Sequence, residues 1–115
     1  VLSGKYNDGA LPEGARFTDY IQGEERQRKM ASRFFNPQSE LSTRRFQAIA
    51  AEAGMSVVTL AIAWSKQHDF VASTIVGATT AEQMPEILAA AEVTLPPEVL
   101  AQINAVSREI RYPMG

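Results

Sequence analysis

The stretch Thr74-Ile75-Val76-Gly77-Ala78-Thr79-Thr80-Ala81-Glu82-Gln83 reads as a β-branched strand that passes through a glycine into a helix. Gly77 lets the backbone approach a ligand closely. The hydroxyls of Thr79 and Thr80 lie beside the free N–H groups and positive dipole end of that helix. Thr80 and Gln83 also have the spacing of a capping box. Such a junction suits an anion, but ordinary strand-to-helix connections share the pattern, so both interpretations stay open.

The segment resembles the eighth strand and helix of the aldo-keto reductases, where a Gly-Ala-Ser/Thr-x-x-Glu-Gln run holds the 2′-phosphate of NADPH. Upstream, Leu2-Ser3-Gly4-Lys5-Tyr6 and Leu11-Pro12-Glu13-Gly14-Ala15-Arg16 look like the run after the family's seventh strand. This likeness is to the branch that includes bacterial reductases and voltage-gated potassium channel β subunits. Between these motifs, Leu60-Ala61-Ile62-Ala63-Trp64 resembles the family's LAIAW helix. The resemblance therefore covers nearly the whole chain.

The resemblance implies an eight-unit β/α barrel, for which about 250 residues are typical. This chain has 115 residues and starts where the family's seventh strand has ended. We therefore expect residues 1–115 to be the C-terminal part of a (β/α)8 TIM barrel, of α/β class but mostly helical. The family's catalytic tetrad of Asp, Tyr, Lys and His lies on earlier strands, so no catalytic residue is expected here. His68 stands at the polar end of a helix with no second metal ligand nearby in sequence, which favours a structural role.

By the same resemblance, the chain divides into a cofactor-covering loop region over 1–38, the last helices and eighth strand over 39–110, and a tail over 111–115. Residues 5–38 are punctuated by Gly, Pro and Asn, and irregular loops of that length are usually functional or mobile. Match to the family makes Lys5 and Arg16 candidate ligands of the cofactor phosphates. Arg16 is favoured, because a guanidinium fork suits phosphate. Composition alone would instead make both side chains solvated surface cations.

Four residues are expected to hold the adenosine end of NADPH: Gly77, Thr79, Gln83 and Glu86. In the family, the glutamate accepts a hydrogen bond from the adenine amino group. Two residues depart from the family's pattern. Ile87 replaces the usual Asn and removes one hydrogen bond to adenine, and Pro85 requires a distorted first turn or a later helix start. No Lys or Arg lies within the turn from Gly77 to Thr80, which weakens the expected preference for NADPH over NADH.

The periodicity of apolar residues predicts four main helices. The first is capped by Ser42 or Thr43 and stopped by Gly54, and the second is capped by Ser56. The third extends over 81–91, and the fourth starts at Pro96 or Pro97. The expected inward residues include Val57, Leu60, Ala61, Trp64, Met84, Ile87, Leu88, Ala91, Val99, Leu100, Ile103 and Val106. The one convincing strand is 71–76, a run typical of a parallel sheet covered on both faces. Its backbone partners are expected from the rest of a barrel or from another copy.

Composition excludes several classes of function. The chain has no cysteine, which excludes disulfides, thiolate metal sites and cysteine catalysis. A net charge of −2 argues against a nucleic-acid partner, and the mixed-sign run Glu24–Lys29 reads as the solvated face of a short helix with Met30 and Phe34 inside. No apolar run reaches the roughly 18 residues of a membrane helix. We expect a soluble, cytoplasmic protein with a loose tail over 108–115.

Three hypotheses for function follow. The first is the C-terminal, cofactor-binding part of an NADPH-dependent oxidoreductase that reduces a small carbonyl compound, with the 115-residue chain alone lacking the catalytic residues. The second is a cofactor-binding regulatory subunit like the channel β subunits. The third is a helical module without activity that associates with itself through uncovered apolar faces.

Overall fold

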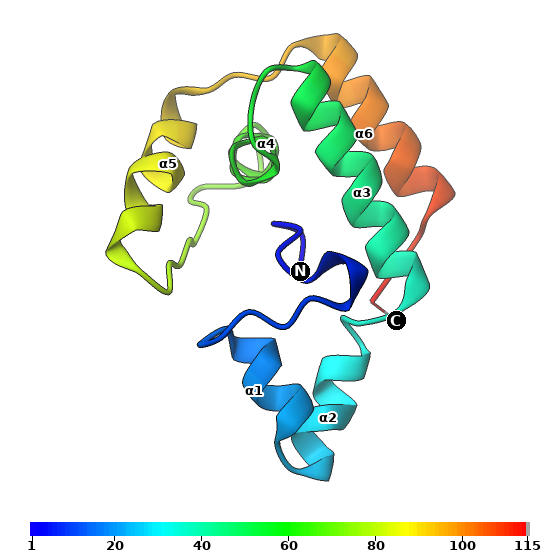
Figure 1. The fold of residues 1–115 in the computed structure, drawn as a ribbon. Helices are drawn as coiled ribbons and strands as arrows, with labels where there is room; N and C mark the ends of the chain where they lie inside the picture. Colours follow the sequence, from blue (N-terminus) through cyan, green and yellow to red (C-terminus); the bar gives the residue numbers. More distant parts are fainter. Residues whose placement is uncertain (115) are drawn as a thin grey trace.

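The computed structural model describes residues 1–114. Its helices are α1 (Arg16–Gln22), α2 (Glu25–Ser32), α3 (Pro37–Glu52), α4 (Val57–Lys66), α5 (Met84–Ala89) and α6 (Pro97–Glu109) (Figure 1). Three short 3-10 turns accompany them: η1 (Asn7–Gly9), η2 (Ala81–Gln83) and η3 (Ala90–Glu92). The expectation of a mostly helical chain is confirmed, whereas no β-strand forms among residues 1–114.

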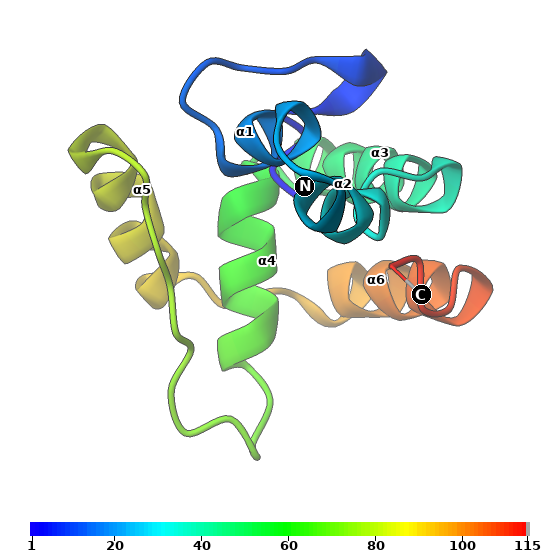
Figure 2. The ribbon, with the colours of Figure 1, turned by 90° about the horizontal axis from the view of Figure 1, so that it is seen from below.

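The strand predicted over 71–76 is wrong, because this segment is extended but unpaired. Ile75 is 96% exposed, and Phe70 just before the segment is 85% exposed. Residues 72–78 make no hydrogen bond to another backbone group of the described chain. A strand needs a neighbour to form its ladder, and residues 1–114 supply none. The segment is therefore the long loop that joins α4 to α5 in Figure 2.

The core lies among α3, α4 and α6. α3 and α6 run antiparallel side by side in Figure 1, while α4 crosses them and is seen end-on. The fully buried and small side chain of Ala63 lies in the middle of α4. The buried cluster comprises Ile49, Ala50, Val57, Leu60, Ala63, Leu95, Val99, Ile103 and Val106. The inward stripes predicted for α4 and α6 are thus confirmed.

The start of α3 differs from the prediction. Asn36 is its N-cap, with the side-chain oxygen accepting from the Ser39 N–H at 2.9 Å, and Pro37 fills the first helical position. Proline is favoured there because its missing N–H would have had no helical partner. Ser42 and Thr43, predicted as caps, are buried within the helix. The Asn-Pro pair was the stronger start signal.

The corner between α3 and α4 follows the sequence closely. Gly54 has a φ of +70°, which a glycine adopts without strain. The N–H groups of Gly54 and Met55 bond to the carbonyls of Ala51 and Ala50, as in a Schellman motif. Ser56 then caps α4 by accepting from the Thr59 N–H at 3.1 Å. Both the predicted stop at Gly54 and the predicted cap at Ser56 are confirmed.

The end of α4 is tied to the start of α6 by one side-chain amide. Gln67 Nε2 donates to the Leu95 carbonyl at 3.0 Å, and the Leu95 N–H donates to Gln67 Oε1 at 2.6 Å. The glutamine thus pairs with Leu95 as a neighbouring strand would. Leu95 is only 2% exposed, so both of its backbone groups depend on this partner.

The helix predicted over 81–91 is divided into η2, α5 and η3. Pro85 lies in the first turn of α5, where its missing N–H costs little. The expectation of a distorted first turn or a later helix start is confirmed, because the 3-10 turn η2 precedes α5. Ile87 is buried as predicted. Leu88 is 61% exposed and Ala91 is exposed, so their predicted inward positions are wrong. The broken helix turns Ala90 inward instead.

Residues 5–38 are less irregular than predicted, because α1 and α2 form a hairpin there (Figure 1). The helix expected from the mixed-sign run is α2. Its Met30 is 49% exposed, so the predicted inner position of this side chain is wrong. Aromatic side chains fill the space between the hairpin and the chain start: Tyr6, Phe17, Tyr20, Phe34 and Phe35.

The C-terminal segment is held more firmly than predicted. Residues 108 and 109 close the last turn of α6. The Pro113 carbonyl accepts from Asn36 Nδ2 at 2.8 Å and from the Ser39 hydroxyl at 3.0 Å. The tail therefore returns to the start of α3. Gly115, the last residue of the predicted tail, lies outside the described residues.

Among residues 1–114, no single helix combines the length and the apolar character needed to cross a membrane. α3 and α4 taken together pass by length and composition, but they are bent by 91° at their junction. Both contribute to the core described above.

The Gln67 bridge provides a test of this packing. Gln67→Met keeps the side-chain length but leaves the buried Leu95 N–H and carbonyl without partners, so we expect a loss of about 2 kcal/mol in the free energy of unfolding. Urea denaturation followed by circular dichroism measures it. Gln102→Met is the matched control, because Gln102 is exposed and makes a single 3.5 Å contact with Glu52. Equal midpoints for the two variants would show that the bridge does not stabilise the fold.

Candidate functional site

A cleft of about 630 Å³ lies between the start of the chain and the segment that enters α5. All six residues predicted to contact a cofactor line it: Lys5, Arg16, Gly77, Thr79, Gln83 and Glu86. They come from two regions some 60 residues apart in sequence, 5–16 and 77–86. The structure therefore brings the predicted residues together, and their roles stay predictions. Each of the six is exposed, so the cleft is open to solvent.

The first wall is built around Tyr6. This side chain is buried, and its hydroxyl accepts from the Phe17 N–H at 3.3 Å, which joins the start of the chain to α1. Lys5 precedes it, with Nζ 5.3 Å from the Tyr6 ring centre. Arg16 precedes Phe17 at the start of α1. Tyr6 thus holds the two candidate cations on one side of the cleft.

The second wall is the turn from Gly77 to η2. Gln83 reaches back across it, and its Oε1 accepts from the Thr79 N–H at 3.0 Å and from the Thr79 hydroxyl at 3.2 Å. The capping box predicted from Thr80 and Gln83 is wrong, because Thr80 makes no side-chain cap. The donors of Thr79 are therefore satisfied within the chain, and an anion would have to displace the Gln83 amide oxygen.

The carboxylate of Glu82 lies beside two further donors of this turn. The N–H of Glu82 itself and, to a smaller extent, the Thr80 hydroxyl hold the pKa of the Glu82 carboxyl below its usual value. Both donors favour the ionised form by hydrogen bonding to it. The negative charge of Glu82 therefore opposes a second anion beside these donors.

The charges along the cleft are unequally placed. Lys5 and Arg16 give the first wall two cations, whereas the second wall carries Glu86 in the first turn of α5 and no cation between Thr74 and Glu86. The buried Ile87 and the half-buried Val58 contribute apolar surface below them. A ligand with anionic groups at one end and a flat, partly apolar group at the other suits this arrangement.

Sequence reasoning missed the residues that support the site. The motif over residues 2–6 does not reveal the role of Tyr6, although a buried tyrosine needs a partner for its hydroxyl and finds it at the Phe17 N–H. The signal for Val58 was weaker, because it lies beside the helical stripe of α4 rather than on it.

The structure offers no alternative metal or histidine centre in the part of the chain that it describes. No group of three or more His, Asp or Glu side chains is placed to hold a metal among residues 1–114. His68 lies at the end of α4, with Nδ1 2.8 Å from the Trp64 carbonyl oxygen and its ring against the Trp64 indole. It does not line the cleft.

The chain belongs to the aldo/keto reductases, as its motif order indicated. A sequence model described as "Aldo/keto reductase family" matches residues 6–108. The expectation drawn from the sequence motifs is thereby confirmed, and the family's fold is a β/α barrel.

Curated relatives support the assignment. "Protein tas" of Escherichia coli (strain K12) is 33% identical over 113 residues, which cover 98% of this chain and 30% of the relative. A "Probable voltage-gated potassium channel subunit beta" of Oryza sativa subsp. japonica is 36% identical, covering 92% of this chain and 31% of the relative. An "L-glyceraldehyde 3-phosphate reductase" of Escherichia coli O157:H7 is 31% identical, covering 90% of this chain and 29% of the relative. The chain thus spans about a third of the length of the relatives it matches.

The carboxylate held by the turn can be tested by titration. Thr80→Val removes one of the two donors to Glu82, so we expect the pKa of Glu82 to rise toward its usual value of 4.5. Carbon-13 NMR of the side-chain carboxyl against pH measures this shift. Because the folded-state pKa is lowered, the stabilisation is complete above pH 4.5 and is lost as the pH falls through the folded-state value.

Thr79→Val is the matched control for this titration. The hydroxyl of Thr79 donates to Gln83 and not to Glu82. Its removal should therefore leave the pKa of Glu82 as in wild type. An equal pKa of Glu82 in wild type and in Thr80→Val would contradict a hydrogen bond from the Thr80 hydroxyl to the Glu82 carboxylate.

Proposed function

We propose that this chain binds the adenosine end of NADPH within an oxidoreductase of the aldo/keto reductase family. One observation carries the proposal. Six residues, selected from two separate stretches of sequence, line a single cleft. The types of side chain match the ligand, with cations for phosphates, donors in the turn and a carboxylate for an amino group.

The cations of the first wall would contact the phosphates. Arg16 can donate two parallel hydrogen bonds to the 2′-phosphate, and Lys5 adds a point charge toward the pyrophosphate. The turn at Thr79 would add its N–H and hydroxyl once Gln83 rotates away. Because the turn itself contains no cation, Arg16 has to supply most of the discrimination between NADPH and NADH.

The second wall would receive the adenine. The Glu86 carboxylate can accept from the exocyclic amino group of the base. Ile87, which stands where the family usually has Asn, is buried and can offer only apolar contact. The base would thus be held by one polar contact and by packing, so its orientation depends on Glu86.

The activity of the whole protein is part of the same proposal. NADPH supplies a hydride, and the family's reaction passes it to a small aldehyde or ketone, with a proton following from a tyrosine. The residues of this chain would bind and orient the cofactor, and the catalytic residues would lie outside residues 1–115. We accordingly propose a cytoplasmic reductase, and no turnover by the 115-residue chain alone.

The potassium channel relatives favour a second candidate. Relatives of that description from Schizosaccharomyces pombe and Oryza sativa subsp. japonica are 32% and 36% identical to the chain. A regulatory subunit that keeps a cofactor site would use the same cleft. Steady-state reduction of small aldehydes by the whole protein distinguishes the two, since bound NADPH without turnover favours regulation.

Binding of 2′,5′-ADP tests the proposal on the chain itself, because this probe carries the 2′-phosphate without the nicotinamide. We expect it to shift the amide resonances of residues 77–80 and to bind more tightly than 5′-ADP, which lacks the 2′-phosphate. Arg16→Met should weaken its affinity about tenfold, as expected for the loss of a charged hydrogen bond worth about 1.4 kcal/mol. NMR titration measures both quantities.

Arg26→Met is the matched control for this titration, because Arg26 is an exposed arginine on α2 outside the cleft. The proposal predicts an unchanged affinity in that variant. Equal weakening by the two substitutions would mean non-specific attraction of the anion to the chain's charge. Absence of any shift at residues 77–80 would remove the proposed site.

A further inference from the structure

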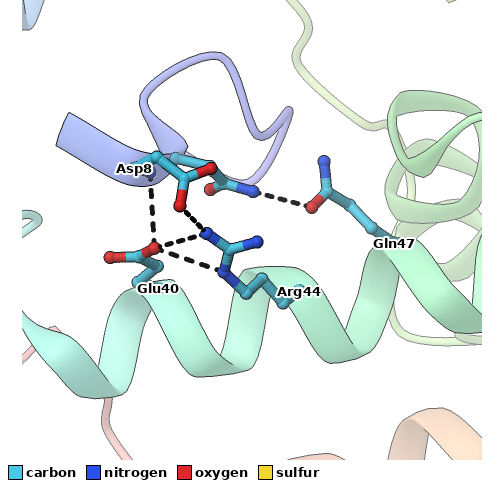
Figure 3. Close-up of polar contacts among 5 residues, drawn as sticks. Asp8, Glu40, Arg44 and Gln47 are labelled. Atoms are coloured by element: carbon cyan, nitrogen blue, oxygen red, sulfur yellow. Dashed lines mark hydrogen bonds and ion pairs between the residues drawn. The ribbon is translucent and has the colours of Figure 1, made fainter. Parts of the chain in front are cut away.

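Five polar side chains connect η1 to α3 (Figure 3). We call it the clasp, and its members are Asn7, Asp8, Glu40, Arg44 and Gln47. Arg44 lies between two carboxylates, with Nη2 2.5 Å from Asp8 Oδ1 and 2.8 Å from Glu40 Oε1. Asn7 Nδ2 donates to Gln47 Oε1 at 2.8 Å. The sequence motifs did not single out the three residues from α3.

Glu40 organises this network. It lies one turn before Arg44 on the same helix and accepts from both Nε and Nη2 of that arginine. Its Oε1 also accepts from the Asp8 N–H at 3.4 Å. The hydrogen bonds from the Arg44 side chain and from the Asp8 N–H lower the pKa of Glu40. Because Glu40 already orients the guanidinium, capturing Asp8 requires less side-chain ordering than an isolated ion pair would.

The clasp is in contact with the cleft wall through Gln47. A Cβ built on Gly4 would lie only 1.9 Å from Gln47 Nε2, so the Gln47 amide is packed directly against the backbone of Gly4. Lys5 follows Gly4, and Asn7, bound to the same glutamine, is three residues beyond Gly4. The segment that carries Lys5 and Tyr6 is thus held on α3 at both of its ends.

The backbone of this segment has three residues with positive φ. Gly4, Asp8 and Gly9 have φ values of +79°, +58° and +72°. Glycine adopts these values freely, whereas an aspartate does so only at some cost. A conformation of this kind persists where the surrounding contacts hold it. The clasp supplies side-chain contacts from α3 that hold the observed conformation.

We propose that Arg44 and Gln47 are positioning residues for the cleft, which keep Lys5 and Tyr6 in place and thereby set how long an anionic ligand stays bound. This inference rests on the proposed function for the nature of the ligand. Neither side chain lines the cleft, so neither touches the ligand. Loss of the clasp frees the wall to move and leaves the binding groups themselves unchanged.

Arg44→Met tests the proposal, and Arg45→Met is its matched control. Arg45 is the next residue on α3 and makes an ion pair of similar length, but with Glu109 of α6 rather than with η1. In the chain without ligand, Arg44→Met should lower the nitrogen-15 order parameters of residues 5–9 below about 0.6, the range of flexible backbone. Arg45→Met should leave them as in wild type.

The residence time of 2′,5′-ADP gives a second readout that a loss of stability alone would not move. We expect Arg44→Met to speed its dissociation about fivefold at low salt, the size expected when a surface ion pair is lost. Asp8→Asn, which tolerates the left-handed backbone, should have the same effect. The double variant should dissociate no faster than either single variant, because both substitutions break the same ion pair between Asp8 and Arg44.

The outcomes separate the clasp from the proposed function. Unchanged order parameters in Arg44→Met overturn the clasp, whatever the ligand does. Increased motion with an unchanged residence time overturns its role in ligand retention. If wild type does not bind 2′,5′-ADP, the proposed function fails, and the order parameters alone then decide whether Arg44 positions the wall.

Discussion

The perpendicular packing of α4 against α3 is the constraint on which the rest of the structure depends. α3 holds the first wall of the cleft through Gln47 and Arg44, and α4 packs against α5 and η3, which lead from the second wall. The distance between the two walls therefore depends on the angle of the corner at Gly54 and on the packing of the buried faces around Leu60 and Ala63. The cleft has no ladder of strands to fix it within the described residues.

Local signals in the sequence predicted much of the helical framework. Ser56 as a cap, Gly54 as a stop and the Pro96-Pro97 pair as a helix start each depend on the chemistry of one or two residues, so no distant partner was needed. The apolar stripe of α6 was likewise visible, because its period is a property of the helix alone. The family followed from motif order, which the match over residues 6–108 confirms.

The errors arose where distant partners decide the outcome. Residues 71–76 have the composition of a buried strand, but a strand is a property of two segments. Leu88 is exposed because α5 is interrupted by 3-10 turns, which periodicity cannot reveal. For the candidate site, the sequence indicated which residues would gather but not what supports them. The bond from Phe17 to Tyr6 and the contact of Gln47 with Gly4 join residues more than ten positions apart.

The unpaired segment between α4 and α5 also affects how the chain behaves in concentrated solution. From Phe70 to Ala81 it contains no charged residue and no proline, and Ile75 presents nearly its whole surface to water. Charges and prolines are what usually keep an open strand edge from pairing with its like. The same run that suits the interior of a barrel thus has the composition typical of segments that form cross-β aggregates, and Ile75→Lys would be the simplest protection against this.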